Sequence, residues 1–170
     1  MKGAILGVIS RAWDLFRSLG INRVPVYLID DRLNVGRFSK YCKKYIQIDS
    51  ENYEKNLMKC LVELAEEARG WMLLPMGDDH VGIIAKNRNT LMRYYELPTK
   101  EWDLLEYFYD KTFNYQLASR LNIPIPKTFY PQGEADLEAL EQEIGYPVLL
   151  KPAIVHKLYM KTHIQLGSHP

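Results

Sequence analysis

Two lysines occupy positions from which a folded chain can bind an anion. Lys111 follows Asp110, and if Asp110 caps a helix, Lys111 lies in its first turn. A cation there opposes the helix dipole by roughly 0.3–1 kcal/mol, unless the lysine and the helix N-terminus face an anion together. Lys151 ends the apolar run 147–150, and strand ends in α/β folds commonly present ligand groups. Each lysine taken alone is equally typical of a solvated surface.

Four further polar side chains are candidates for a site. Asp78 and Asp79 lie in a polar loop predicted over 75–80, where they could face a substrate or simply form a turn and cap a helix. His156 and Lys157 lie a few residues after Lys151 in the sequence. A surface position is an equally good interpretation of His156.

The first half of the chain predicts alternating strands and helices. Unbroken apolar runs predict strands, and between them lie helical patterns with one apolar face. We expect Ser10 to begin the first helix and Gly20 to end it, Asp49 or Ser50 to cap the second, and Gly70 to end the second. The predicted strands are 3–9, 24–29, 45–48 and 71–74, and further helices are predicted over 81–87 and 90–95. This order predicts an α/β fold, a Rossmann-like parallel sheet with helices on both faces.

A boundary is predicted at Leu97-Pro98-Thr99, which divides the chain into domains 1–98 and 99–170. The second domain is expected to be a partial α+β subdomain. Its predicted helices are 101–109, one beginning near 110, and 136–144, and its predicted strands are 127–130 and 147–152, with 122–126 extended.

Composition excludes several classes of protein. Hydrophobic residues make up 47% and charged residues 25% of the 170, which is ordinary for a globular protein. The formal net charge of +1 gives no global field for nucleic acid or a membrane, so neither is expected as a partner. The spacing of Cys42 and Cys60 is typical of neither a disulfide framework nor a metal site. No signal peptide opens the chain, and a cytoplasmic location is expected.

The ordered set of motifs in the second half resembles a known family. The pair Asp110-Lys111, then NIPIP at 122–126, then IGYPVLLKP at 144–152 resemble the opening of an ATP-grasp domain. That family shows DK at a helix start, a G-I-P-x-P turn and a G-(Y/F)-P-(V/L)-x-x-K-P segment. Asn122 departs from the usual glycine, although asparagine tolerates left-handed backbone. The loop 75–80 with Asn87-Arg88 resembles the end of the preceding domain in carboxylate–amine ligases of the D-aspartate-ligase-like or carbamoyl-phosphate-synthetase-like kind.

The resemblance implies roles for the candidate residues. Lys111 and Lys151 resemble the lysines that hold the ATP phosphates, and His156 and Lys157 fall where the family places a loop over the triphosphate. Asp78 and Asp79 fall where the first domain faces the acceptor substrate. The implied cofactors are ATP and Mg²⁺, and the implied substrates are a small carboxylate and an amine, joined through an acylphosphate with release of ADP.

The same resemblance implies that part of the family's machinery lies outside this sequence. No catalytic residue and no Mg²⁺ ligand is predicted in this chain, because the carboxylate-rich stretch 134–143 reads as the solvated face of a helix. We therefore expect a truncated, N-terminal portion of such a ligase, inactive when isolated and binding ATP weakly at most.

Two other functions compete with this interpretation. A nicotinamide-dependent Rossmann enzyme would explain the acidic pair Asp30-Asp31 after the second strand, but it requires a glycine fingerprint where Gly7-Val8-Ile9-Ser10 stands. A non-catalytic module or split subunit would instead bind a partner that completes the ATP site. An unfinished sheet and an exposed apolar face would also favour a homodimer.

Overall fold

The computed structural model describes residues 2–6, 13–33, 35–145 and 147–151. The chain divides into two compact units, 1–105 and 106–170, and each is described separately. The domain boundary predicted between residues 98 and 99 stays a prediction, because compact units need not coincide with functional domains.

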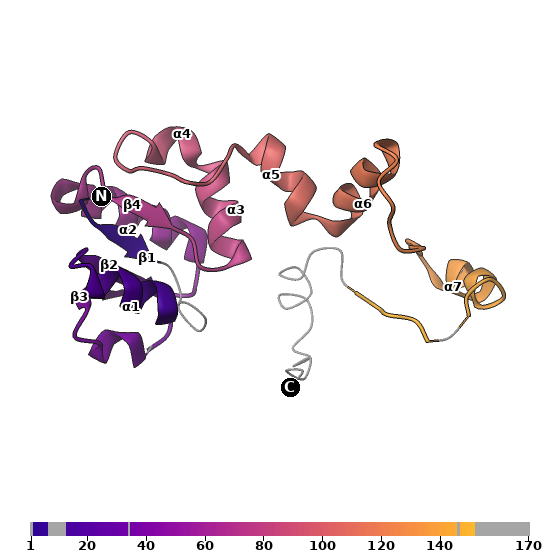
Figure 1. The fold of residues 1–170 in the computed structure, drawn as a ribbon, viewed down its shortest axis with the longest axis horizontal. Coiled ribbons are helices and arrows are strands. Elements are labelled where there is room, and N and C mark those ends of the chain that lie inside the picture. Colours follow the sequence, from indigo (N-terminus) through magenta and orange to yellow (C-terminus); the bar gives the residue numbers. More distant parts are fainter. Residues whose placement is uncertain (1, 7–12, 34, 146, 152–170) are drawn as a thin grey trace. The chain divides into compact units, whose positions relative to one another are not determined.

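The first unit contains a four-stranded parallel sheet of order β3-β2-β1-β4 (Figure 1). Its strands are β1 (Ala4–Leu6), β2 (Val26–Asp30), β3 (Cys42–Gln47) and β4 (Met72–Leu74). Its helices are α1 (Trp13–Ile21), the 3₁₀ turn η1 (Val35–Phe38), α2 (Tyr53–Ala68), α3 (Asp78–Lys86) and α4 (Arg88–Leu91), followed by α5 (Trp102–Tyr109), which crosses the boundary. The predicted Rossmann-like α/β fold is confirmed.

Helices cover both faces of this sheet, and the central strand β2 is buried along its whole length. Along β2, Val26 and Leu28 pack with Phe16 of α1, whereas Tyr27 and Ile29 point to the other face. The larger core lies on that other face, where α2 contributes Leu57, Leu61 and Leu64 and α3 contributes Ile84.

The free edge of β4 is covered by a short return of the chain. Glu96 pairs with Met72 in an isolated parallel bridge, and the backbone N–H of Leu73 donates to the Glu96 carbonyl at 2.9 Å. Arg88 then holds the following segment, because its guanidinium donates to the Thr99 carbonyl at 3.0 Å and lies 3.4 Å from the Glu101 carboxylate. The predicted break at 97–99 is therefore anchored to the first unit.

Several predicted helix ends differ from those observed. Gly20 does not end α1; Arg23 takes the left-handed conformation (φ 59°), and the N–H of Val24 donates to the Leu19 carbonyl. Gly20 serves a close approach instead, since a Cβ there would lie 2.2 Å from Cγ of Tyr41. Ser10, the other predicted end of that helix, lies outside the described residues.

The second helix begins later than predicted. Neither Asp49 nor Ser50 caps α2: Asn52 occupies the N-cap position, and the Asp49 side chain accepts from the N–H of Glu51 at 2.8 Å in a turn before the helix. The prediction that Gly70 ends α2 is confirmed, because the helix stops at Ala68 and Gly70 follows with a left-handed φ of 79°.

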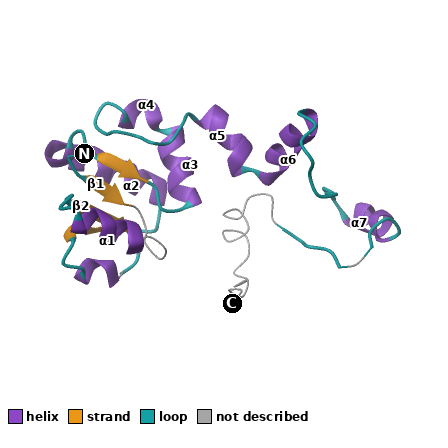
Figure 2. Cartoon of the chain, viewed as in Figure 1, coloured by secondary structure: helices purple, strands orange, loops and turns teal. Residues whose placement is uncertain are grey.

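The described part of the second unit contains helices and extended segments (Figure 2). After the end of α5 come α6 (Lys111–Arg120) and α7 (Glu134–Glu141). The predictions of strands at 127–130 and over 147–151 are wrong, because neither segment forms a strand in the described part. Val148, Leu149 and Leu150 are 53%, 78% and 91% exposed, so this apolar run has no neighbouring strand to pair with.

Candidate functional site

The carboxyl edge of the parallel sheet brings several polar side chains together. Strand β2 ends at Asp30, and β4 ends at Leu74, followed by a short loop and the start of α3 at Asp78. In a parallel sheet these ends meet at one edge, which is where open α/β folds bind ligands. The carboxyl edge therefore carries acidic groups from β2 beside the first turn of α3.

Asp30 and Asp31 form a carboxylate pair at this edge. Asp30 is 1% exposed, and its side chain accepts from the N–H of Arg32 at 3.0 Å. Partial burial raises the pKa of Asp31, and the hydrogen bond and negative charge of Asp30 raise it further. The Arg32 guanidinium, 3.9 Å from Asp31, opposes this rise in pKa. Asp31 therefore takes up a proton at a higher pH than a separate aspartate does.

A tyrosine–histidine pair lies beside these carboxylates. The hydroxyl of Tyr53, at the start of α2, is 2.5 Å from Nε2 of His80 in the first turn of α3. His80 is 4% exposed, and this burial lowers its pKa against the opposing charges of Asp79 and Asp31. Burial raises the pKa of Tyr53, and the charges of Asp31 and Asp30 raise it further. Both side chains are therefore neutral at neutral pH.

One nitrogen of His80 has no hydrogen-bond partner in the described part of the chain. This atom is the buried Nδ1, which faces Gly77 and would lie 3.6 Å from a Cβ at that glycine. Because Tyr53 keeps its proton and can donate it to Nε2, the proton of the neutral imidazole belongs on Nδ1. The pair therefore presents an N–H donor to the turn that begins α3.

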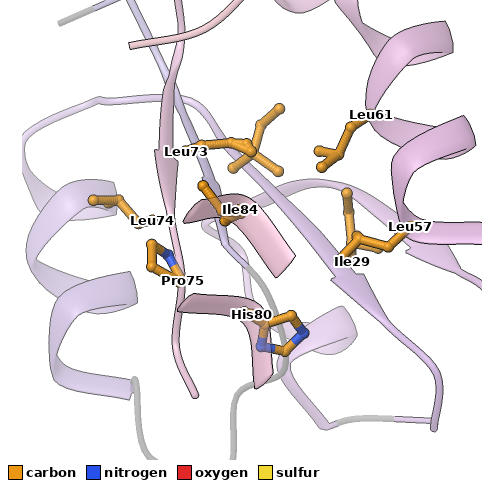
Figure 3. Close-up of a pocket in the computed structure, with 9 residues that line it drawn as sticks. Ile29, Leu57, Leu61, Leu73, Leu74, Pro75, His80 and Ile84 are labelled. Carbon is orange, nitrogen blue, oxygen red and sulfur yellow. The ribbon is translucent and has the colours of Figure 1, made fainter. Parts of the chain in front are cut away.

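His80 also borders a small apolar cavity of about 20 Å³, roughly the size of one water molecule (Figure 3). The cavity lies between the sheet, α2 and α3, and Ile29, Leu57, Leu61, Leu73, Pro75 and Ile84 are among its lining residues. Its size excludes a substrate, so any substrate at this edge must bind outside the cavity.

The predicted loop over 75–80 is shorter than expected. Helix α3 begins at Asp78, so Asp78 and Asp79 lie in its first turn, after Gly77 at the N-cap. Carboxylates in that turn complement the positive end of the helix dipole, which explains why the helix begins before 81. Asp78 is exposed and Asp79 half-buried. The role of both residues toward a substrate stays a prediction.

The two predicted phosphate-binding lysines lie in the second unit. Lys111 is the first residue of α6, and Asp110 caps that helix by accepting from the N–H of Thr112 at 2.8 Å, as predicted. Lys151 is exposed in the extended segment after Val148. Both lysines lie in the second unit, and their arrangement around a shared phosphate group stays a prediction. His156 and Lys157 lie outside the described residues.

A second cavity, of about 160 Å³, lies between the end of α5 and α6. Tyr107 and Phe113 form part of its wall, with ring centroids 6.4 Å apart, and Glu106 and Arg120 add opposite charges. The sequence analysis did not single out this cavity.

The implied Mg²⁺ can be tested against the side chains present. Across 2–6, 13–33, 35–145 and 147–151, no three His, Cys, Asp or Glu side chains lie close enough to hold a metal ion. Within the same ranges, no helix has the length and apolar character needed to cross a bilayer.

Sequence reasoning missed Tyr53 and His80 as members of a polar cluster. The sequence pattern placed Tyr53 on the apolar face of the second predicted helix, and it placed His80 in the loop predicted over 75–80. The signal that could have found them was position, because both follow strands of the same parallel sheet and must reach its carboxyl edge.

Comparison with known proteins places this geometry beside two ligases. The chain is 27% identical over 131 residues to D-aspartate ligase from Enterococcus faecium (strain Aus0004), covering 72% of this chain and 31% of that protein. Its fold is similar to that of L-amino acid ligase from Bacillus licheniformis, with a TM-score of 0.67, 14% identity, and coverage of 90% of this chain and 37% of that one. No family model matches the chain. The chain thus spans about a third of each relative, and its similarity to these two ligases is partial and distant.

Proposed function

We propose that the chain forms the N-terminal portion of an ATP-dependent carboxylate–amine ligase that works through an acylphosphate and releases ADP. The observation that carries this proposal is the position of Lys111, the first residue of the ten-residue helix α6. Its charge and the first-turn N–H groups other than that of Thr112, which Asp110 accepts, favour the same anion, and such an arrangement can bind phosphate. The sequence similarity to D-aspartate ligase extends over most of this chain.

In this proposal each unit has its own task. Lys111 and Lys151 hold phosphate oxygens of ATP as point charges, and His156 and Lys157 lie near them in sequence. Asp78 and Asp79 face the amine acceptor from the first unit, where negative charge attracts an ammonium group. The carboxylate substrate attacks the γ-phosphate, ADP leaves, and the amine then displaces phosphate from the acylphosphate.

We infer that the isolated chain binds ATP weakly and does not catalyse ligation. The two ligases that it resembles are more than twice its length, and the segments that they carry in addition are expected to complete the site. The complete ligation reaction is therefore proposed only for a protein that supplies those segments.

A split arrangement is the second candidate function. The exposed run Val148, Leu149 and Leu150 favours it, because three consecutive exposed apolar residues are unusual on a finished surface. In this case the chain is a non-catalytic module whose partner covers the run and completes the ATP site. A homodimer would cover the exposed run without completing the ATP site, because a second copy adds none of the missing segments.

The experiment that tests nucleotide binding is a titration of the full chain with a fluorescent ATP analogue in MgCl₂. We expect weak binding that falls about tenfold or more in Lys111→Ala, the loss expected for one charge-assisted hydrogen bond. Lys127→Ala is the matched control, since Lys127 is an exposed lysine of the same unit that pairs with Glu143. Equal binding by wild type and Lys111→Ala would contradict the proposal.

An assay for ADP release separates the two candidate functions. Robust turnover by the chain alone would contradict both the inactivity of the isolated chain and the need for a partner. Turnover that appears only after addition of a polypeptide carrying the rest of a ligase supports the split arrangement.

A further inference from the structure

We infer that the basic loop, here residues 32–33 and 35–44, is a docking surface for an anionic lipid membrane. The loop carries five cations and no acidic residue, although the whole chain has a net charge of only +1. The balanced composition of the chain therefore conceals a local concentration of positive charge. The cations are Arg32, Arg37, Lys40, Lys43 and Lys44.

Apolar side chains stand out from the same loop. Leu33, just before η1, is 67% exposed. Val35 and Phe38, at the two ends of η1, are 65% and 75% exposed. They are interleaved with the cations, and the Arg37 guanidinium lies 4.5 Å from the centroid of the Phe38 ring. Insertion of these apolar side chains into a lipid interface would bring the neighbouring cations to the level of the headgroups.

The fold holds the loop in this exposed form. At its base, Gly20 of α1 lets the ring of Tyr41 pack closely, and the Tyr45 hydroxyl donates to the Arg32 carbonyl. Within the loop, the N–H of Ser39 donates to the Gly36 carbonyl at 3.0 Å. The apolar side chains therefore cannot fold back onto the core without breaking these contacts.

Nearby carboxylates neutralise only part of the charge. Lys44 forms an ion pair with Glu67, and Arg32 lies 3.9 Å from Asp31. In the described part of the chain, Arg37, Lys40 and Lys43 form no ion pair within 4.0 Å, although the charge of Glu67 also acts on Lys43. Three cations thus remain for an external anionic surface.

The shape of the loop favours lipid over other polyanions. Neither cavity described above includes a described residue of the loop, so neither offers a partner protein an anchoring pocket at this surface. Leu33 and Val35 are aliphatic and offer a nucleic-acid base no ring to stack on, and Phe38 is the one aromatic ring among these three exposed side chains. A lipid interface needs no concavity and accepts separate apolar side chains of different size.

The test is cosedimentation of the full chain with vesicles of phosphatidylcholine, with and without 30% (about one third) phosphatidylglycerol. We expect binding to the anionic vesicles that weakens with added salt, and little binding to neutral ones. Each removed cation should weaken binding about fivefold, so the triple variant Arg37→Gln, Lys40→Gln, Lys43→Gln should bind about a hundredfold more weakly. Phe38→Ser should also weaken binding.

Two control variants match these changes elsewhere on the first unit. Lys55→Gln, Lys59→Gln, Arg93→Gln removes the same charge from α2 and the segment after α4, and Met92→Ser removes an apolar side chain that is 56% exposed. Both should bind anionic vesicles like the wild type, and circular dichroism checks that every variant is folded.

Three results would overturn the inference. The first is equal binding of the wild type to neutral and anionic vesicles, and the second is unchanged binding by the triple loop variant. The third is binding to soluble polyglutamate or an oligonucleotide with none to vesicles, which would assign the loop to a protein or nucleic-acid partner. None of these measurements depends on ligase activity.

Discussion

The hydroxyl oxygen of Tyr53 lies 2.5 Å from Nε2 of His80, and this contact joins the starts of α2 and α3 at the carboxyl edge of the sheet. It is the one hydrogen bond described for the His80 ring, since the buried Nδ1 has no partner in the described residues. The stability of this edge should therefore depend strongly on a single hydroxyl group.

Tyr53→Phe should lower the free energy of unfolding by about 1–3 kcal/mol, because it leaves both nitrogens of the buried imidazole without partners. Urea denaturation measures the change. Tyr94→Phe is the control, because the ring of Tyr94 packs against Tyr95 and no hydrogen bond of its hydroxyl is described. A loss of similar size in both variants would show that the Tyr53 hydroxyl has no special role.

Stability should fall as the pH drops below the ordinary histidine pKa of about 6.5. Burial lowers the pKa of His80 in the folded state, so the unfolded chain binds the proton first and stability is lost as pH decreases from 6.5 toward the lowered value. Urea denaturation at pH 7.5 and 5.5 (roughly one unit either side of the histidine pKa) measures this loss.

The comparison variant for this pH effect is His80→Gln, which retains the other three histidines of the chain. The wild type should lose more stability than His80→Gln between the two pH values. Parallel losses in the two proteins would assign the pH dependence to groups other than His80.

Gly20→Ala should destabilise the first unit by roughly 1–3 kcal/mol, the range for overpacking. A Cβ at this position would lie 2.2 Å from Cγ of Tyr41, so the ring or the helix must move. The double variant Gly20→Ala, Tyr41→Ala should cost less than the sum of the single changes, because the clash is absent. Additive losses in this cycle of thermal melts would refute the close approach.

Asn122→Ala should destabilise the second unit by about 1 kcal/mol, whereas Asn122→Gly should be neutral or slightly stabilising. Asn122 has a φ of 54°, and the N–H of Ile123 donates to the Ala118 carbonyl at 2.9 Å, which ends α6. Chemical denaturation followed by the aromatic fluorescence of this unit compares the variants. Equal stability of the alanine and glycine variants would be inconsistent with a left-handed backbone at this position.

Much of the fold was predictable from local pattern. The apolar runs around Ile5, Leu28 and Leu73 mark strands whatever their neighbours are, and the long stripe of α2 marks a helix buried on one face. Asp110 was predictable as a cap and Asn122 as a left-handed residue, because both depend on interactions within a few residues. The relationship to ATP-grasp carboxylate–amine ligases also followed from short motifs.

The errors occur where a distant partner decides the structure. The run before Lys151 has the composition of a strand, but a strand requires a neighbouring backbone, and the described residues of the second unit provide none. Gly20 has the sequence position of a helix terminator, but its lack of a side chain serves the ring of Tyr41.

The sequence by itself determined the parallel α/β architecture of the first unit, the capped start of α6 at Lys111 and the family resemblance, because each depends on short-range periodicity or motif. Only the tertiary structure decided that Tyr53, His80 and the Asp30–Asp31 pair share one edge, and that Leu33, Val35 and Phe38 remain outside the core. Segments far apart in sequence must pack together before side chains become buried or meet at one edge of a sheet. A local sequence pattern therefore does not predict which side chains come into contact and which stay exposed.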